Sequence, residues 1–392
     1  MISVKLIFWL LIISVLYVYI GYGIILFLYV KLFGKRKKHG NVTEEWADIT
    51  LFITAYNEKD YVEIKMQNCK ELDYPESKLS IIWVTDGSDD GTEILLKNYS
   101  GVEIYHQPER KGKIAAMNRG MQFVKTQVVV FSDANTIINK DALKIIASKF
   151  TEPKVGCVAG EKRIFNSDLG NAASSGEGLY WKYESKLKEL EADFHSTVGG
   201  AGELFAIRTE LFREVEADTL LDDFIISLRI VAMGYIIAYT PDAYASETSS
   251  ANINEELKRK IRISAGGIQS VLRLSYLLNP FQYGVFAWQF LSHKVLRWLW
   301  VPFVLPVIFI LNVIIVCLQF NNPYNVYDII MLLQLIFYII AIAGWMLQNK
   351  KIRLKIFFAP FYIFIMNYAV YLGLFRYIKG SQTVNWERAR RA

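Results

Sequence analysis

The chain has 392 residues, enough for one large domain or two of ordinary size. Hydrophobic residues make up 53% and charged residues 21%, a balance that favours a membrane protein over a wholly soluble one. The net charge of +6 comes from basic clusters beside apolar segments, without an aromatic–basic groove pattern, so we expect no nucleic-acid partner.

The first predicted element is a membrane-spanning helix. Leu6 to Val30 is an almost unbroken apolar run, and about 20 such residues cross the hydrocarbon core of a bilayer. A signal peptide is the alternative, but here the basic run Lys35–Lys38 follows the apolar stretch instead of preceding it. We therefore predict an uncleaved transmembrane helix over residues 1–33, with the N-terminus outside and the basic run in the cytoplasm.

The middle of the chain, residues 45–250, has the composition of a soluble domain. Short β-branched runs alternate there with helical stretches: runs at 49–55, 79–85, 102–106 and 128–131, and helices at 63–73, 92–99 and 114–124. This alternation predicts an α/β domain with a parallel sheet covered on both faces. In such sheets, ligands bind at the carboxyl ends of the strands.

The last part of the chain returns to membrane character. Residues 251–298 mix basic and apolar side chains and fit amphipathic helices at the bilayer surface. Residues 299–378 hold C-terminal membrane segments, with credible spans at 299–320 and 329–347, and 379–392 form a basic cytoplasmic tail. The segment 356–378 lies between two basic clusters that both look cytoplasmic, so it is re-entrant or interfacial, or the positive-inside rule fails here.

Acidic and polar motifs follow the predicted strands, and their order carries a resemblance. The motifs are Thr54–Glu58 (TAYNE), Thr85–Thr92 (TDGSDDGT), Lys111–Lys113 (KGK), Asp133–Asn135 (DAN), Leu221–Asp223 (LDD) and Arg259–Ile263 (RKIRI). Together, over about residues 48–300, the sequence resembles the membrane-integrated family 2 glycosyltransferases, which include cellulose, chitin, hyaluronan and poly-N-acetylglucosamine synthases. The resemblance implies a cytoplasmic GT-A (Rossmann-like) domain between transmembrane helices. It also implies inverting transfer from a UDP-sugar to a glycan acceptor at the cytoplasmic face of the inner membrane, giving a β-linked polysaccharide.

The resemblance assigns residues to the donor. The nucleotide-binding residues it implies are Ala55, Tyr56, Glu58, Asp86, Lys113, Asp133 and Arg262. A lysine and backbone N–H groups at a helix start suit a diphosphate. Asp133 and Asn135 stand where the family has its Asp-x-Asp metal motif, so we expect Mg²⁺ or Mn²⁺, bound more weakly because Asn135 brings no charge.

The resemblance also assigns a base and an acceptor site. Asp223 is expected to take the proton of the acceptor hydroxyl, with Asp222 orienting it or binding the acceptor. Two adjacent acids raise each other's pKa, since like charges oppose ionisation. Acceptor contacts are expected from Gly202, Glu203 and Trp181. Ile263 stands where the family has a tryptophan under the acceptor sugar, and Trp181 is one aromatic that could replace it.

Each motif alone also fits a structural role. TAYNE can be a strand-to-helix cap, TDGSDDGT and DAN can be turns, the acid pair can be helix N-terminal acids, and RKIRI can be a membrane-surface helix. Two other functions stay open. One is a glycolipid synthase that adds a single sugar to a lipid acceptor, and the other is a non-catalytic nucleotide-binding partner of a synthase. A separate export or accessory subunit is a further possible partner.

Overall fold

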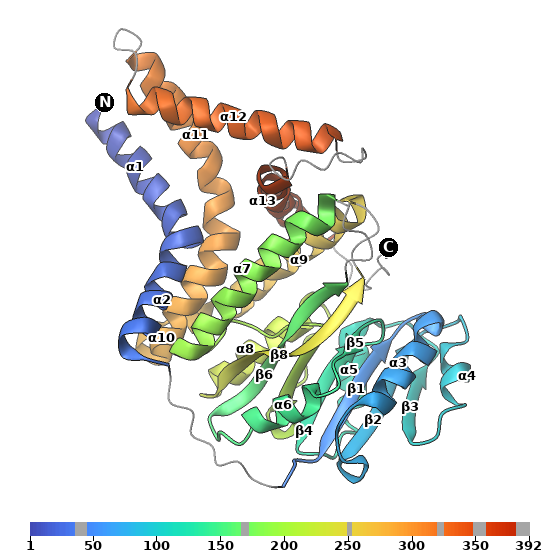
Figure 1. Ribbon diagram of the computed structural model, residues 1–392. Helices are drawn as coiled ribbons and strands as arrows, with labels where there is room; N and C mark the ends of the chain where they lie inside the picture. Colours follow the sequence, from blue (N-terminus) through green and yellow to red (C-terminus); the bar gives the residue numbers. More distant parts are fainter. Residues whose placement is uncertain (36–44, 166–171, 249–252, 320–324, 348–357, 382–392) are drawn as a thin grey trace.

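The structure, a computed structural model, describes the chain except residues 36–44, 166–171, 249–252, 320–324, 348–357 and 382–392. A group of apolar helices lies on one side of an α/β domain, with helices α7 (Ala172–Phe194) and α9 (Ile253–Arg273) between the two parts (Figure 1). Most of the basic run at 35–38, the cluster at 350–355 and the motif at 386–391 lie outside the described residues. The orientation predicted from them therefore stays a prediction.

The domain is built on one eight-stranded sheet with the order β3-β2-β1-β4-β7-β6-β8-β5. The four runs predicted as strands are confirmed and are parallel: β1 (Ile49–Ala55), β2 (Leu79–Asp86), β3 (Val102–Gln107) and β4 (Val128–Asp133). The rest of the sheet is formed by β5 (Ile137–Ile138), β6 (Val155–Phe165), β7 (Leu204–Arg208) and β8 (Ile236–Thr248).

The parallel arrangement predicted from the first four strands does not extend through the second half of the sheet, although β6 and β8 pair in parallel there. Strand β7 is antiparallel to β4 and β6, and β5 is antiparallel to β8. The cause is the direction from which the chain enters β7. Its first residue, Leu204, pairs with Ser132 near the end of β4, so β7 starts at the edge where the parallel strands finish.

Helices cover both faces of the sheet, and the strand side chains alternate between two cores. Leu51 and Ile53 of β1 face the core that includes α3 (Lys59–Glu71) and α6 (Ala142–Lys149). Phe52 faces the core that includes α5 (Lys113–Met121) and α8 (Asp222–Ala232). Gly120 lets α5 approach closely, because a Cβ there would lie 2.4 Å from the Phe52 ring. The remaining short helices are α4 (Thr92–Leu96), η2 (Glu76–Lys78), η3 (Thr209–Leu211) and η4 (Ser275–Leu278).

Four helices of the described chain are long and apolar enough to cross a membrane, as judged by length and composition. The first joins α1 (Ile2–Leu16), η1 (Tyr17–Gly21) and α2 (Tyr22–Phe33). The second joins α10 (Pro280–Phe290), η5 (Leu291–Trp300) and α11 (Val301–Leu318). The others are α12 (Val326–Leu347) and α13 (Phe358–Ile378), and together the four make this a multi-pass membrane protein.

The membrane helices are not a simple parallel bundle. Helices α1 and α11 pack side by side through Phe8, Val304 and Ile308, whereas α12 crosses above them and α13 is seen nearly end-on (Figure 1). Helix α13 packs on α9, where a Cβ at Gly373 would lie 2.8 Å from the backbone nitrogen of Ala265. Segment 280–298, expected as an interface helix, runs on into α11 after a kink at Gly284, whose φ of 51° and ψ of −124° are not helical.

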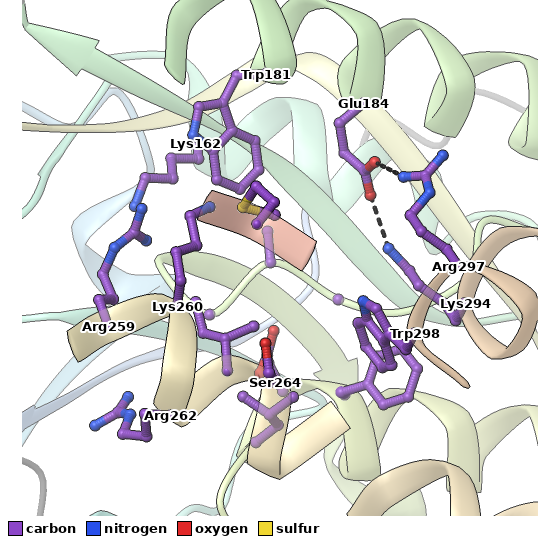
Figure 2. A pocket seen from close by; sticks show the side chains of 18 of the residues that line it. Lys162, Trp181, Glu184, Arg259, Lys260, Arg262, Ser264, Lys294, Arg297 and Trp298 are labelled. Carbon is purple, nitrogen blue, oxygen red and sulfur yellow. Dashed lines mark hydrogen bonds and ion pairs between the residues drawn. The ribbon is translucent and has the colours of Figure 1, made fainter. Parts of the chain in front are cut away.

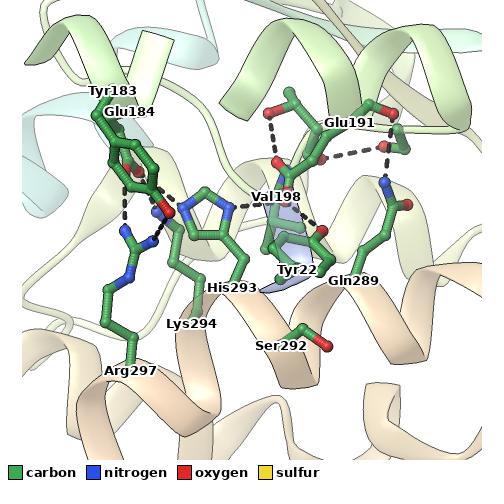
Figure 3. Close-up of polar contacts among 12 residues, drawn as sticks. Tyr22, Tyr183, Glu184, Glu191, Val198, Gln289, Ser292, His293, Lys294 and Arg297 are labelled. Carbon is green, nitrogen blue, oxygen red and sulfur yellow. Dashed lines mark hydrogen bonds and ion pairs between the residues drawn. The ribbon is translucent and has the colours of Figure 1, made fainter. Parts of the chain in front are cut away.

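A buried charged cluster joins these helices to the domain. His293 of η5 lies between two glutamates of α7, 2.8 Å from Glu191 Oε1 and 2.9 Å from Glu184 Oε1 (Figure 3). Lys294 and Arg297 also contact Glu184, at 2.7 and 2.8 Å. The basic residues that interrupt the apolar pattern at 293–297 therefore face α7 rather than water.

Candidate active site

The predicted site residues of the first strands meet at one edge of the sheet. In the strand register, Thr54 pairs with Asp133 and Ala55 pairs with Thr85. Asp86, the last residue of β2, pairs with Gln107 at the end of β3. The carboxyl ends of four parallel strands thus lie side by side, as the alternating pattern predicted.

The motifs after β1 and β2 are tied together by hydrogen bonds. The backbone N–H of Asn57 donates to Ser88 Oγ at 3.1 Å, and its side-chain amide donates to Asp89 at 2.8 Å. Asn57 has a positive φ of 53°, and the N-cap of α3 is Glu58, so Asn57 does not cap that helix. Tyr56 stacks under the Arg110 guanidinium, whose Cζ lies 3.6 Å from the ring centroid.

Asp86 shapes the loop that precedes Lys113. Its buried carboxylate accepts hydrogen bonds from the backbone N–H of Gly112 at 2.7 Å and of Lys111 at 3.1 Å. These contacts fix the start of α5, which begins at Lys113. The contact of Asp86 with a nucleobase, implied by the family resemblance, stays a prediction.

Lys113 lies between two of the predicted acids. Its Nζ is 2.9 Å from Asp133 Oδ1 and 3.1 Å from Asp222 Oδ2. Desolvation lowers the pKa of Lys113, but the two carboxylates raise it above the ordinary value, so the side chain stays cationic. Residues more than 100 positions apart in the sequence are therefore joined in one charged group.

Asp223 has a pKa raised towards neutral pH by its surroundings. Desolvation and the neighbouring Asp222 carboxylate raise the pKa of Asp223 to about 7, against the opposing effect of Lys113. Gly202 leaves space beside it, because a Cβ there would lie 3.6 Å from the Asp223 carboxyl carbon. A carboxyl that titrates near neutral pH can accept a proton and release it again.

Arg262 adds a cation whose hydrogen-bonding capacity is partly unused. Desolvation lowers its pKa, whereas Asp222, Asp133 and Asp223 raise it. Its buried Nε has no hydrogen-bond partner within the part of the chain that the structure describes. A buried unpaired donor beside three carboxylates suits an anionic ligand.

The predicted acceptor residues lie on a second side of the same pocket. Lys162 of β6 reaches Glu203 Oε1 at 2.5 Å and also contacts Glu247, and this ion pairing lowers the pKa of Glu203 to about 2 despite desolvation. The Trp181 ring lies between two ammonium groups, with Lys162 Nζ at 5.5 Å and Lys260 Nζ at 5.9 Å from its centroid (Figure 2). Trp181 thus lies beside two cations in the pocket.

These groups line one cavity of about 340 Å³. Eight of the predicted site residues line it: Lys113, Asp133, Trp181, Gly202, Glu203, Asp222, Asp223 and Arg262. The other five do not: Ala55, Tyr56, Glu58, Asp86 and Asn135 lie at or near the strand ends without lining this cavity. Ile263, at the family's tryptophan position, also lines it.

The donor set fits a divalent cation only together with a ligand. Among the described residues, no group of three or more His, Cys, Asp or Glu side chains is placed to hold a metal ion. Asp133 and Asn135 offer one carboxylate and one amide oxygen, and Mg²⁺ commonly takes one or two carboxylates plus substrate phosphates. The residues present therefore suit a cation bound mainly by a diphosphate.

Sequence reasoning missed a buried lysine that supports the Asp133–Asn135 turn. Lys65 Nζ donates to Ser132 Oγ at 2.7 Å and to the Thr136 carbonyl at 2.8 Å, on either side of the turn. Burial lowers the pKa of Lys65 to about 8. One lysine in a polar helix carries no local signal of such a role.

Comparison with known proteins supports the interpretation of this chain as a family 2 glycosyltransferase. Residues 50–216 match the family model "Glycosyl transferase family 2", which confirms the resemblance drawn from the motifs. The chain is 29% identical over 252 residues to the poly-β-1,6-N-acetyl-D-glucosamine synthase of Staphylococcus aureus, and 27% identical over 239 residues to that of Staphylococcus epidermidis. The first alignment covers 61% of this chain but only 59% of the synthase, and the second 57% and 56%.

A solved structure shows the same fold over almost the whole chain. It is a mannosyltransferase, PcManGT from Pyrobaculum calidifontis, in complex with GDP-Man and Mn²⁺. The TM-score is 0.68, with 19% sequence identity, and the match covers 95% of this chain and 99% of that one. This likeness confirms the predicted GT-A fold.

Proposed function

We propose that this protein, which carries a glycosyl transferase family 2 domain, transfers a sugar from a UDP-sugar to an acceptor hydroxyl with inversion, giving a β-linked glycan. One observation carries the proposal. Lys113, Asp133, Asp222 and Asp223 line one cavity, and the pKa of Asp223 is raised to about 7. Lys113 suits a leaving diphosphate, Asp133 suits a divalent cation bound to that diphosphate, and Asp223 suits a base.

The donor half of the site binds and stabilises the diphosphate. Lys113 and Arg262 supply positive charge where UDP departs, and the unpaired Arg262 Nε can donate to a phosphate oxygen. Asp133 and Asn135 would hold a divalent cation jointly with the diphosphate. That cation, when bound, neutralises charge on the leaving group.

The acceptor half activates a hydroxyl. Asp223 takes the hydroxyl proton as the oxygen attacks the anomeric carbon, and the bond from that carbon to the diphosphate oxygen breaks. Attack from the face opposite UDP inverts the configuration, so an α-linked donor gives a β-linked product. Asp222 keeps Lys113 in place and holds the pKa of Asp223 high.

The membrane helices and the relatives support a membrane setting for the reaction. We place the domain on the cytoplasmic face of the inner membrane, because UDP-sugars are made in the cytoplasm. The lipid bilayer is then one of its partners. The acceptor is a glycan or a lipid, and an export subunit is a further partner to look for. The names of the staphylococcal relatives make UDP-N-acetylglucosamine the first donor to test.

The test is a donor screen with the whole protein in lipid nanodiscs. UDP release is measured with UDP-N-acetylglucosamine, UDP-glucose and UDP-galactose, each with Mg²⁺, with Mn²⁺ and with a chelator. We expect cation-dependent release with one of these donors. Release from none, although UDP itself binds, would favour the non-catalytic alternative.

A further inference from the structure

A second cavity lies among the membrane helices, beyond the catalytic one. It measures about 780 Å³, within the range of about 300–1,000 Å³ typical of ligand pockets. Its walls come from α1, η1, η5, α11, α12 and α13, with a single residue, Tyr183, from α7. Apolar side chains such as Val15, Leu305 and Phe337 make up most of the lining.

Several polar groups of this lining are already hydrogen-bonded within the protein. Arg297 contacts Glu184, and the Gln334 side-chain oxygen accepts a hydrogen bond from Asn312 at 2.9 Å. The Asn367 amide donates to the Ile363 carbonyl of its own helix, and the Tyr371 hydroxyl donates to the Pro302 carbonyl. A glycan in this cavity would leave many of its hydroxyls unpaired, at about 2–7 kcal/mol for each group buried without a hydrogen bond.

The two cavities share a wall. Five residues line both of them: Tyr19, Arg297, Tyr362, Ile363 and Asn367. The catalytic cavity therefore extends from Asp223 to the side chains that close the apolar cavity. A molecule with a polar head in one cavity and an apolar tail in the other would pass between these five side chains.

The apolar cavity also opens sideways on the helix surface. Leu16 and Ile20 of the first membrane helix line it and are 52% and 55% exposed, and Leu333 of α12 is 59% exposed. These positions lie on helices long and apolar enough to cross a bilayer. A lipid in the surrounding membrane could enter at this rim without leaving the apolar phase.

We infer that the acceptor is a membrane lipid with a free hydroxyl, whose hydrocarbon chain lies in the apolar cavity and whose hydroxyl reaches Asp223. This inference rests on the proposed function and narrows its acceptor. A hydrocarbon chain that moves from the bilayer into this cavity stays in an apolar environment, whereas a sugar there would give up hydrogen bonds with water. In the reaction the lipid oxygen bonds to the anomeric carbon, its proton passes to Asp223, and UDP leaves.

The first experiment asks where the sugar goes. The whole protein is placed in nanodiscs made from a total bacterial lipid extract, or from pure phosphatidylcholine, which has no free hydroxyl. Radiolabelled donor is supplied at a concentration below that of the protein, so that the glycan built on each acceptor stays short. We expect label in the organic phase from the extract nanodiscs, and only free sugar from the phosphatidylcholine nanodiscs.

The second experiment fills the cavity. Leu333→Trp places bulk in the lining, and Leu332→Trp is the matched control, because Leu332 is 58% exposed on the same helix but does not line the cavity. We expect Leu333→Trp to lower transfer to lipid by about tenfold, equivalent to about 1.4 kcal/mol, with donor hydrolysis to free sugar unchanged. The Leu332→Trp control should transfer as much sugar to lipid as the unmodified protein does.

The outcomes separate this inference from the proposed function. Label recovered only as water-soluble glycan, with equal yield in both kinds of nanodisc, would overturn the lipid acceptor and leave glycosyl transfer standing. Equal effects of Leu333→Trp and Leu332→Trp on transfer to lipid would also overturn the cavity's role. Absence of UDP release under every condition would instead count against the proposed function.

Discussion

Replacing Asp223 by asparagine is expected to abolish transfer and, at the same time, to stabilise the fold at high pH. Loss of a general base typically costs about 10²–10⁴-fold in rate. The stability effect follows from the pKa of Asp223, which desolvation and Asp222 raise from 3.8 to about 7. Between these pH values the folded protein holds a proton that the unfolded chain releases, so the free energy of unfolding falls as the pH rises.

The size of the stability effect follows from the same pKa values. At about 1.36 kcal/mol for each pKa unit, the difference corresponds to at most about 4 kcal/mol. The stability effect is smaller than this limit, because Asp223 is half-buried and lines the cavity. The Asp223→Asn variant lacks this fall in the free energy of unfolding at high pH. Its melting temperature should therefore exceed that of the unmodified protein at pH 8 and approach it near pH 4.

The assay pairs UDP release with thermal unfolding across this pH range, in the same nanodiscs. Asp242→Asn is the matched control, because Asp242 is exposed and does not line the catalytic cavity. Near-normal turnover in the Asp223→Asn variant would refute the assignment of the base. The raised pKa of Asp223 would be refuted if the melting temperatures of the Asp223→Asn variant and of the unmodified protein depended on pH in the same way.

Three further substitutions test the neighbouring groups. Asp222→Asn removes a negative charge that raises the pKa of Asp223, so the acid limb of the pH profile of kcat/KM should move below pH 7; an unmoved limb would contradict the coupling. Lys113→Met should move that limb upwards and raise the KM for the donor by about tenfold, as expected for losing a charge-assisted contact. Asn135→Asp should lower the Mn²⁺ concentration needed for half-maximal activity, because a second carboxylate joins Asp133. An unchanged Mn²⁺ requirement would place the cation away from this turn.

The strand-end part of the site could be predicted from the sequence because local pattern determines it. Short β-branched runs place Asp86 and Asp133 at the ends of parallel strands, and the structure puts those ends side by side. The approach of Asp222 to Lys113 has no local signal, and only the family resemblance brought the two together. The antiparallel β7 was missed because the pattern of apolar residues gives no strand direction.

Other contacts depend on tertiary packing and could not be found in the pattern. Lys162 meets Glu203 and Glu247 across 41 and 85 residues of chain. The charges at 293–297 fall in the segment predicted to lie at the bilayer surface, and no sequence pattern indicates that Glu184 and Glu191 of α7 pair with them. Hydropathy likewise gives the length of a membrane segment but not its direction, so the crossing of α12 over α11 was not predictable.

The most direct test of the account is a structure of the whole protein with UDP and Mn²⁺ bound in lipid. The account predicts the diphosphate between Lys113 and Arg262, the cation beside Asp133, and the Asp223 carboxyl facing an open space next to the diphosphate. Nucleotide density anywhere outside this pocket, or a diphosphate out of reach of both cations, would contradict it.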